Sequence, residues 1–262
     1  MRRAVLRRSL RTIFLVCAVG LAAARCGIPG AARASDSWTH TYPITGRGEI
    51  AVTNTNGRID VEGVDATAVE VTAERIAHGA TEQLARDILP RITITEDVRP
   101  DFISIRSERI EGLLIAAGFE VRYHVKAPRS IVVHATTTNG GVSLRGTAGR
   151  VVAQTTNGGI SATDLRGGIN ARATNGGVRV ELSSVGADSV SLTTVNGGVR
   201  LALPASAKAT VTASWVNGGF STSGLQFDIV DQSRRHFEGR LNGGGATIDL
   251  RTTNGGVTIS SP

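Results

Sequence analysis

The C-terminal half of the chain repeats a short alternation of apolar and polar residues. It recurs at Val142-Ser143-Leu144, Ile160-Ser161-Ala162, Val178-Arg179-Val180 and Val199-Arg200-Leu201. Alternation with a period of two predicts a β-strand that buries one face. Weaker copies lie halfway between these, as at Ile169-Asn170-Ala171. The repeating unit is therefore a turn and a strand of about nine residues.

Each strong copy follows an Asn-Gly-Gly tripeptide, which favours a tight reversal of the chain. Glycine adopts positive φ freely, and asparagine tolerates it better than most residues. Two interpretations stay open at this point: turn chemistry alone, or a ligand site formed by a stacked row of asparagines. The tripeptides are Asn139-Gly140-Gly141, Asn157-Gly158-Gly159, Asn175-Gly176-Gly177, Asn196-Gly197-Gly198, Asn217-Gly218-Gly219, Asn242-Gly243-Gly244 and Asn254-Gly255-Gly256.

The tripeptides are spaced by 18, 18, 21, 21, 25 and 12 residues, so two units make one repeat of about 18 residues. Two architectures fit this spacing. One is an antiparallel meander, and the other is a β-solenoid in which each turn adds one parallel strand to each of two sheets. The solenoid is favoured because small inward side chains can fill a thin two-sheet core. Both architectures place every tripeptide on the same edge.

The N-terminal half predicts an irregular β region with one short helix. The helix covers residues 81–89, where Ala80, Leu84 and Ile88 share a face and Pro90 ends the run. We expect it to cover one face or the open end of a sheet. Since Asn56-Gly57 already opens a repeat-like unit, the N-terminal half is expected to cap the solenoid. Strands are predicted at residues 49–53, 58–61, 68–73, 91–96, 102–106, 120–126 and 131–134.

Residues 1–34 have the pattern of a signal peptide. Five arginines and no acid lie in the first 11 residues, and an apolar stretch follows that is too short to cross a bilayer. Cleavage is predicted between Ala34 and Ser35, which leaves an N-terminal β region at 35–137 and the repeat at 138–262. The expected location is the periplasm or the cell surface. Arg7-Arg8 resembles a twin-arginine export motif, and lipidation at Cys26 is the route by which the protein would reach a membrane.

The formal charge of +7 comes from the signal peptide. Its seven arginines, taken from 29 basic residues, leave 22 basic against 22 acidic residues, so a nucleic-acid partner is not supported. The remaining charge is uneven, −4 over residues 35–137 and +4 over residues 138–262. Arg179 and Arg200 occupy equivalent outward positions and would align in a solenoid. Either these are scattered solvated charges, or the repeat faces an anionic envelope polymer or the acidic half of another copy.

No catalytic, cofactor or metal site is predicted. Both cysteines lie within residues 1–34, and the histidines lack the spacing of metal ligands. The acids of the repeat do not stack in strand register, so the paired carboxylates of a glycosidase are not expected. Residues 228–238, which mix acids with His236 and two arginines, are interpreted as a solvated loop.

The tail carries a family resemblance. Residues 237–259, with Leu241-Asn-Gly-Gly-Gly245 and Thr252-Thr-Asn-Gly-Gly-Val257, resemble the bacterial "putative adhesin" family, domain of unknown function 4097. The resemblance covers about residues 44–260 and assigns 224–240 to a longer loop. It implies a β-solenoid-like fold and an envelope location, and it brings no catalytic residues.

The resulting hypothesis is a non-enzymatic exported envelope protein, an adhesin-like or scaffolding module without cofactor. Its partner would be an envelope glycan, a protein or another copy of itself. One alternative is a carbohydrate-active enzyme on a β-helix. The other is a structural protein that assembles through the last strand, residues 257–259.

Overall fold

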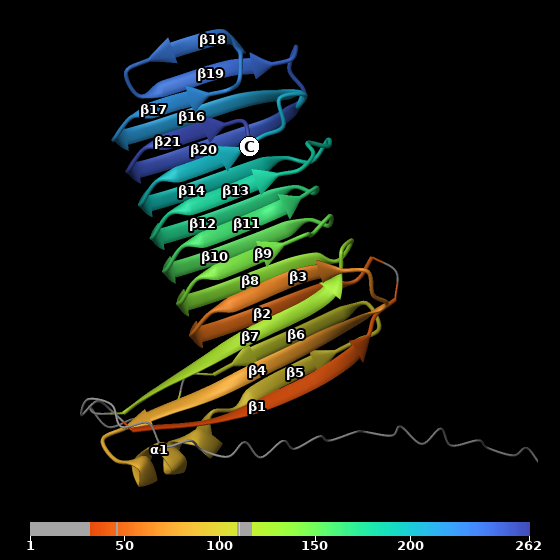
Figure 1. Cartoon of the computed structure of the whole chain (residues 1–262), viewed down its shortest axis with the longest axis vertical. Coiled ribbons are helices and arrows are strands. Elements are labelled where there is room, and N and C mark those ends of the chain that lie inside the picture. Colours follow the sequence, from red (N-terminus) through yellow and green to blue (C-terminus); the bar gives the residue numbers. More distant parts are fainter. Residues whose placement is uncertain (1–31, 46, 109, 111–116) are drawn as a thin grey trace, which may run out of the picture.

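The computed structural model describes residues 32–45, 47–108, 110 and 117–262. It is an all-β structure of two long sheets that face each other, with one short helix at the N-terminal end (Figure 1). Over residues 132–260 the coil strands stack parallel, and every antiparallel pair involves a strand between residues 227 and 241, which confirms the solenoid and excludes the meander.

The ten strands of sheet A are, in spatial order, β1 (Ala32–Pro43), β4 (Ala68–Gly79), β7 (Gly118–Pro128), β3 (Ile59–Val64), β9 (Val142–Arg145), β11 (Ile160–Leu165), β13 (Val178–Leu182), β15 (Val199–Ala202), β21 (Val257–Ser260) and β17 (Phe220–Ser223). The eleven strands of sheet B are β18 (Phe227–Ser233), β19 (His236–Leu241), β16 (Ala209–Asn217), β20 (Ala246–Asn254), β14 (Val190–Asn196), β12 (Ile169–Asn175), β10 (Val151–Asn157), β8 (Val132–Asn139), β2 (Glu49–Asn56), β6 (Phe102–Ser107) and β5 (Ile94–Val98).

Small apolar side chains fill the space between the sheets. Val151, Ile169 and Val190 lie in register on neighbouring strands of sheet B, and Ile160 and Val178 do so in sheet A. All are buried. Burying one such side chain contributes about 1.5 to 3 kcal/mol, so no single coil is stable alone and stability accumulates through neighbours.

The coils do not stack in chain order. The last coil, β20 and β21, lies between the coil of β14 and β15 and the coil of β16 and β17. Strand β21 is therefore paired on both sides, with β15 and with β17. Copies of the protein therefore cannot assemble by pairing with residues 257–259, as one alternative expected, because this strand has no free edge.

The N-terminal region continues both sheets. Strands β2 and β3 form the first coil, while β1, β4 and β7 pair antiparallel beyond it. Strand β8 crosses the expected boundary at residues 137 and 138. Strand β1, before residue 44, was not predicted. Its first residues were assigned to the signal peptide, and most of its inward side chains are polar or small and give no apolar alternation.

The predicted helix is present as α1 (Glu82–Ile88), followed by a 3-10 turn, η1 (Leu89–Arg91). The side chain of Thr81 caps it by accepting from the Leu84 amide, 3.2 Å away. Helix α1 packs against β1 and β4 at the end of the solenoid (Figure 1), and Ile88 is buried. Ala80 was expected on the same buried face but is exposed. None of the described helical segments is long and apolar enough to cross a bilayer.

The segment 224–240, expected as a loop, contains the antiparallel hairpin of β18 and β19. Its inner face holds Phe237, whose ring stacks on Phe220 with centroids 4.3 Å apart. Phe220 in turn stacks on Trp215 at 5.5 Å. These rings close the C-terminal end of the core. The charged residues of the outer face hide the strand pattern in the sequence.

The signal-peptide expectations fall mostly outside the described residues, which begin at Ala32. Cys26 lies outside them. Ala34 and Ser35, on either side of the expected cleavage point, lie within β1, opposite Ala77 and Ile76 of β4.

Candidate binding surface

Asparagine side chains form a continuous ladder along one edge of the solenoid. In the described part of the chain six of the seven amides donate from Nδ2 to the Oδ1 of the asparagine in the neighbouring coil, at 2.8 to 2.9 Å, and Asn56 only accepts. The strand register places these residues directly opposite one another. In spatial order the ladder is Asn56, Asn139, Asn157, Asn175, Asn196, Asn254 and Asn217.

One of the seven tripeptides, Asn242-Gly243-Gly244, is not on this edge. Asn242 lies between β19 and β20 with φ of 51°, and its Nδ2 donates to the backbone oxygens of Ala205 and Ala207. The expectation that every Asn-Gly-Gly shares one edge is therefore wrong for Asn242-Gly243-Gly244. The seventh member of the ladder is instead Asn56, which stands first in its spatial order.

The first glycine of each ladder tripeptide is required by close approach of the neighbouring coil. A Cβ on Gly158 would lie 2.0 Å from the carbonyl oxygen of Gly140. Gly140 and Gly197 are outside the left-handed region, yet a Cβ there would come within 2.1 and 2.2 Å of a backbone oxygen. Crowding is thus the shared reason, and positive φ applies at only some positions. The second glycine is less restricted, since a Cβ on Gly159 would lie 3.2 Å from the nearest atom.

A second row of hydrogen bonds runs beside the ladder. The hydroxyls of Thr155, Thr194 and Thr252 donate to glycine oxygens of the neighbouring coil at 2.7 to 2.8 Å. Thr137 does the same to Gly57 at 3.1 Å. Sequence reasoning missed this row, although a threonine two residues before Asn-Gly-Gly was its visible signal.

The outer face of sheet A carries two adjacent arginines. Arg179 on β13 and Arg200 on β15 are direct partners in the strand register, as expected, and both are exposed. Neighbouring parallel strands lie about 4.8 Å apart. Among the described residues neither arginine has an ion pair or side-chain hydrogen bond. Glu181 lies two residues along β13, on the same face.

Hydroxyl side chains flank this arginine pair. Ser143 and Ser161 precede it in the same row, on β9 and β11. Thr258 and Ser221 follow it, on β21 and β17. The row is therefore polar along its whole length, with its positive charge at the centre.

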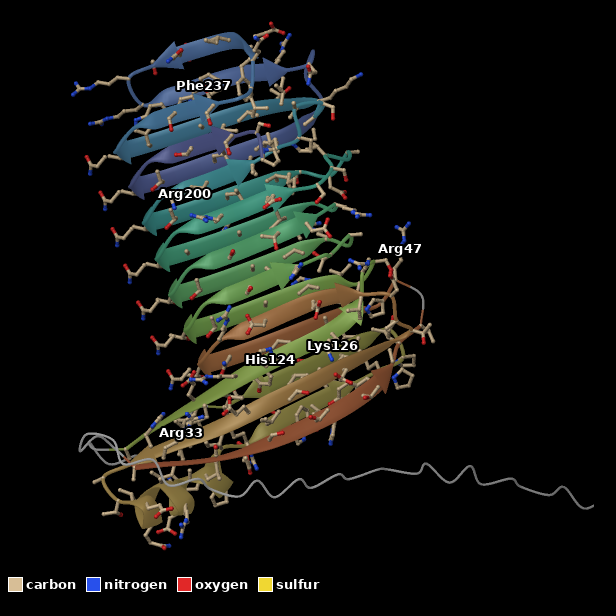
Figure 2. The ribbon with its side chains drawn as sticks, viewed as in Figure 1. Arg33, Arg47, His124, Lys126, Arg200 and Phe237 are labelled. Atoms are coloured by element: carbon tan, nitrogen blue, oxygen red, sulfur yellow. The ribbon has the colours of Figure 1, made fainter. Side chains whose placement is uncertain are left out.

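A groove of about 470 Å³ lies at the N-terminal end of the same face. Its walls carry Asp60 and Glu70 opposite His124 and Lys126. Lys126 lies 3.2 Å from Glu70, and His124 lies 3.6 Å from Asp60. His124, Lys126 and Arg200 are labelled in Figure 2. Acidic and basic side chains, including Glu62 and Arg145, both line the groove, so their charges largely offset one another. The sequence could not predict the groove without knowing that β3 lies between β7 and β9.

Titratable groups with a displaced pKa lie away from the arginine pair. The hydroxyl of Ser183 donates to Asp164 and, with nearby arginines, lowers the pKa of that carboxyl. Burial raises the pKa of Tyr123 to about 12. His236 in β19 lies 3.7 Å from Asp231, across the segment expected as a loop. Within the described ranges no group of three or more His, Cys, Asp or Glu side chains could hold a metal ion.

Several solved structures align with most of this chain at low sequence identity. A putative cell adhesion protein of Clostridium sporogenes ATCC 15579 has 11% identity and a TM-score of 0.49, covering 87% of this chain and 100% of its own. A putative adhesin of Bacteroides fragilis NCTC 9343 has 11% identity and a TM-score of 0.37, covering 87% and 97%. A putative lipid binding protein of Parabacteroides distasonis ATCC 8503 has 8% identity and a TM-score of 0.29, covering 86% and 97%.

Among curated proteins no sequence matches significantly. The family model of Toastrack DUF4097 matches residues 123–260, which span the end of the N-terminal region and the whole solenoid repeat. This match covers more than half of the chain. The protein therefore belongs to the Toastrack DUF4097 family.

Proposed function

We propose that the protein is an exported, non-enzymatic, adhesin-like module whose sheet A binds an anionic macromolecule of the cell envelope. The observation that carries the proposal is the in-register pair Arg179 and Arg200, which is exposed and has no ionic partner within the described part of the chain. The N-terminal pattern of arginines followed by an apolar stretch supports export.

The arginine pair favours an anion on physical grounds. Two like charges on strands about 4.8 Å apart repel by up to about 1 kcal/mol in water, and a bound carboxylate or phosphate turns this cost into attraction. A guanidinium can hold such a group through two parallel hydrogen bonds. The stacked coils hold the two backbone positions on a rigid scaffold, so binding has to order only the arginine side chains.

A polymer suits this face better than a single small anion. Each exposed ionic contact contributes only about 0 to 1 kcal/mol. A chain that also contacts the hydroxyls of Ser161 and Thr258 gains several such contacts at once.

The antiparallel strands β1, β4 and β7, together with α1, would act as the cap that closes the N-terminal end of the solenoid.

The test is binding of the mature protein to immobilised polygalacturonate, with neutral dextran as the reference polymer. Arg179→Ala with Arg200→Ala should weaken binding at least about tenfold, and added salt should weaken it in the wild type. The matched control is Arg150→Ala with Arg172→Ala, which removes the same charge from exposed positions outside this face. Equal loss in both double variants would contradict the proposal.

The same experiment separates the alternatives. Release of shorter sugar chains from polygalacturonate would identify a carbohydrate-active enzyme instead. Filaments that grow with protein concentration would identify a self-assembling protein. Retention without turnover and without filaments is the expected result.

A further inference from the structure

An uncharged strip runs along the ladder edge, separate from the arginine face. It consists of the ladder asparagines from Asn139 to Asn217 and the residue before each of them, which faces outward from sheet B. Those outward residues are Thr138, Thr156, Thr174, Val195, Thr253 and Val216. All side chains of this neutral strip are exposed, including Val195 at 40% and Val216 at 46%.

The strip offers a periodic row of unused hydrogen-bond donors. A carboxamide has two N–H groups, and each ladder amide uses one of them for its neighbour. One N–H per coil therefore remains for a ligand, at intervals of about 4.8 Å. The second glycines next to the ladder, such as Gly159 and Gly177, carry no side chain and are exposed.

We infer that the neutral strip binds a single chain of an uncharged, extended polysaccharide that lies along the solenoid axis. The side chains of the strip are uncharged, and the nearest cations on the same face are Arg172 and Arg251, two residues before Thr174 and Thr253. Its valine and threonine methyl groups can contact the apolar faces of sugar rings, and its amides can donate to hydroxyl and ring oxygens. These oxygens recur on every residue of an extended sugar chain.

Two other occupants fit less well. The strip is about 30 Å long and about 10 Å wide, or about 300 Å², whereas a stable dimer buries about 800 Å² on each partner. A second copy is therefore disfavoured. An extended peptide gains main-chain hydrogen bonds by adding to an exposed strand edge, whereas the strip presents side chains.

Binding to the neutral strip should depend on ligand length. An exposed hydrogen bond contributes only about 0.5 to 1.5 kcal/mol net, so a ligand that spans one or two coils binds weakly. Each further sugar that reaches another coil adds a similar increment. Affinity should rise with length and level off when the ligand spans all six coils of the strip.

The experiment titrates the mature protein with cello-oligosaccharides and chito-oligosaccharides of increasing length. At least one series should bind the wild type with length-dependent affinity. Thr156→Glu with Thr174→Glu, which adds charge to the strip, should weaken the longest ligand about tenfold or more. The control, Thr136→Glu with Gln154→Glu, adds the same charge to exposed positions of β8 and β10 outside the strip and should bind like the wild type.

Three results would overturn the inference: no binding in either series, equal loss in the two double variants, or affinity that does not change with length. Polygalacturonate binding serves as an independent readout, because the strip variant should retain it. The variant with Arg179→Ala and Arg200→Ala should in turn retain the neutral ligand. A dimer of the wild type that the strip variant loses would mean that the strip is a contact between copies.

Discussion

The side chain of Asn157 donates to Oδ1 of Asn139, 2.8 Å away and one full coil earlier in the chain. Asn157 also accepts from Asn175 at 2.9 Å. Asn157→Ala removes both bonds, and we expect it to lower the free energy of unfolding by about 1 to 3 kcal/mol. Urea denaturation monitored by circular dichroism measures this change.

The matched control for the ladder is Thr156→Ala, at the adjacent exposed position, where no side-chain hydrogen bond is lost. Its effect should stay within about 0.5 kcal/mol. If the two variants are equally stable, the ladder contributes nothing measurable and the edge is turn chemistry alone.

The two glycines of one tripeptide should differ in their tolerance of a methyl group. Gly158→Ala places a Cβ 2.0 Å from a backbone oxygen and should destabilise the protein by about 3 kcal/mol, because backbone atoms must move. Gly159→Ala meets its nearest atom at 3.2 Å and should cost less. Thermal melting of the two variants provides the comparison. If the Gly158→Ala protein had the same melting temperature as the wild type, that result would argue against the close packing of the coils.

The period of the repeat was readable from sequence, whereas the order of the coils was not. Alternation in segments such as Val178–Val180 and the spacing of Asn-Gly-Gly predicted short strands and favoured two sheets over a meander, and the structure has two sheets. Local pattern carries no information about which coil is the neighbour of which. The insertion of β20 and β21 depends on the preceding hairpin of β18 and β19, whose packing of Phe237 is a tertiary contact.

Only part of the candidate site could likewise be predicted from the sequence. The alignment of Arg179 with Arg200 followed from equivalent positions in two repeat units. The groove beside His124 could not be predicted, because its walls come from strands far apart in the chain. The stacked row of asparagines was one of two interpretations of the tripeptides. The place of Asn56 in that row could not be predicted, because it depends on a hydrogen bond to Asn139, 83 residues away.

Disulfide cross-linking can test the position of the last coil. Arg200 and Thr258 are direct partners on neighbouring strands, about 4.8 Å apart, which suits a disulfide. Arg200→Cys with Thr258→Cys should therefore cross-link under mild oxidation. The control pair, Arg200→Cys with Ser221→Cys, is separated by the intervening strand β21 and should not cross-link. Coils stacked in chain order would give the opposite pattern on a non-reducing gel.

Cleavage of the signal peptide between Ala34 and Ser35 stays a prediction. It would remove Arg33 and with it the exposed ion pair to Glu74, 2.8 Å long, but it would keep the pairing of Asp36 with Arg75. We expect the shortened protein to fold and to be less stable by about 1 kcal/mol than a chain that begins at Ala32. Intact mass measurement of the protein from the envelope fraction locates the cleavage. A lipid on Cys26 would contradict cleavage at this site.

The most direct test of the proposed binding face is arginine-selective labelling with phenylglyoxal, mapped by mass spectrometry with and without polygalacturonate. The account predicts that the polymer slows labelling of Arg179 and Arg200 and leaves Arg172, on sheet B, unchanged. Protection of Arg172 alone, or equal labelling of all three arginines with and without polymer, would contradict it.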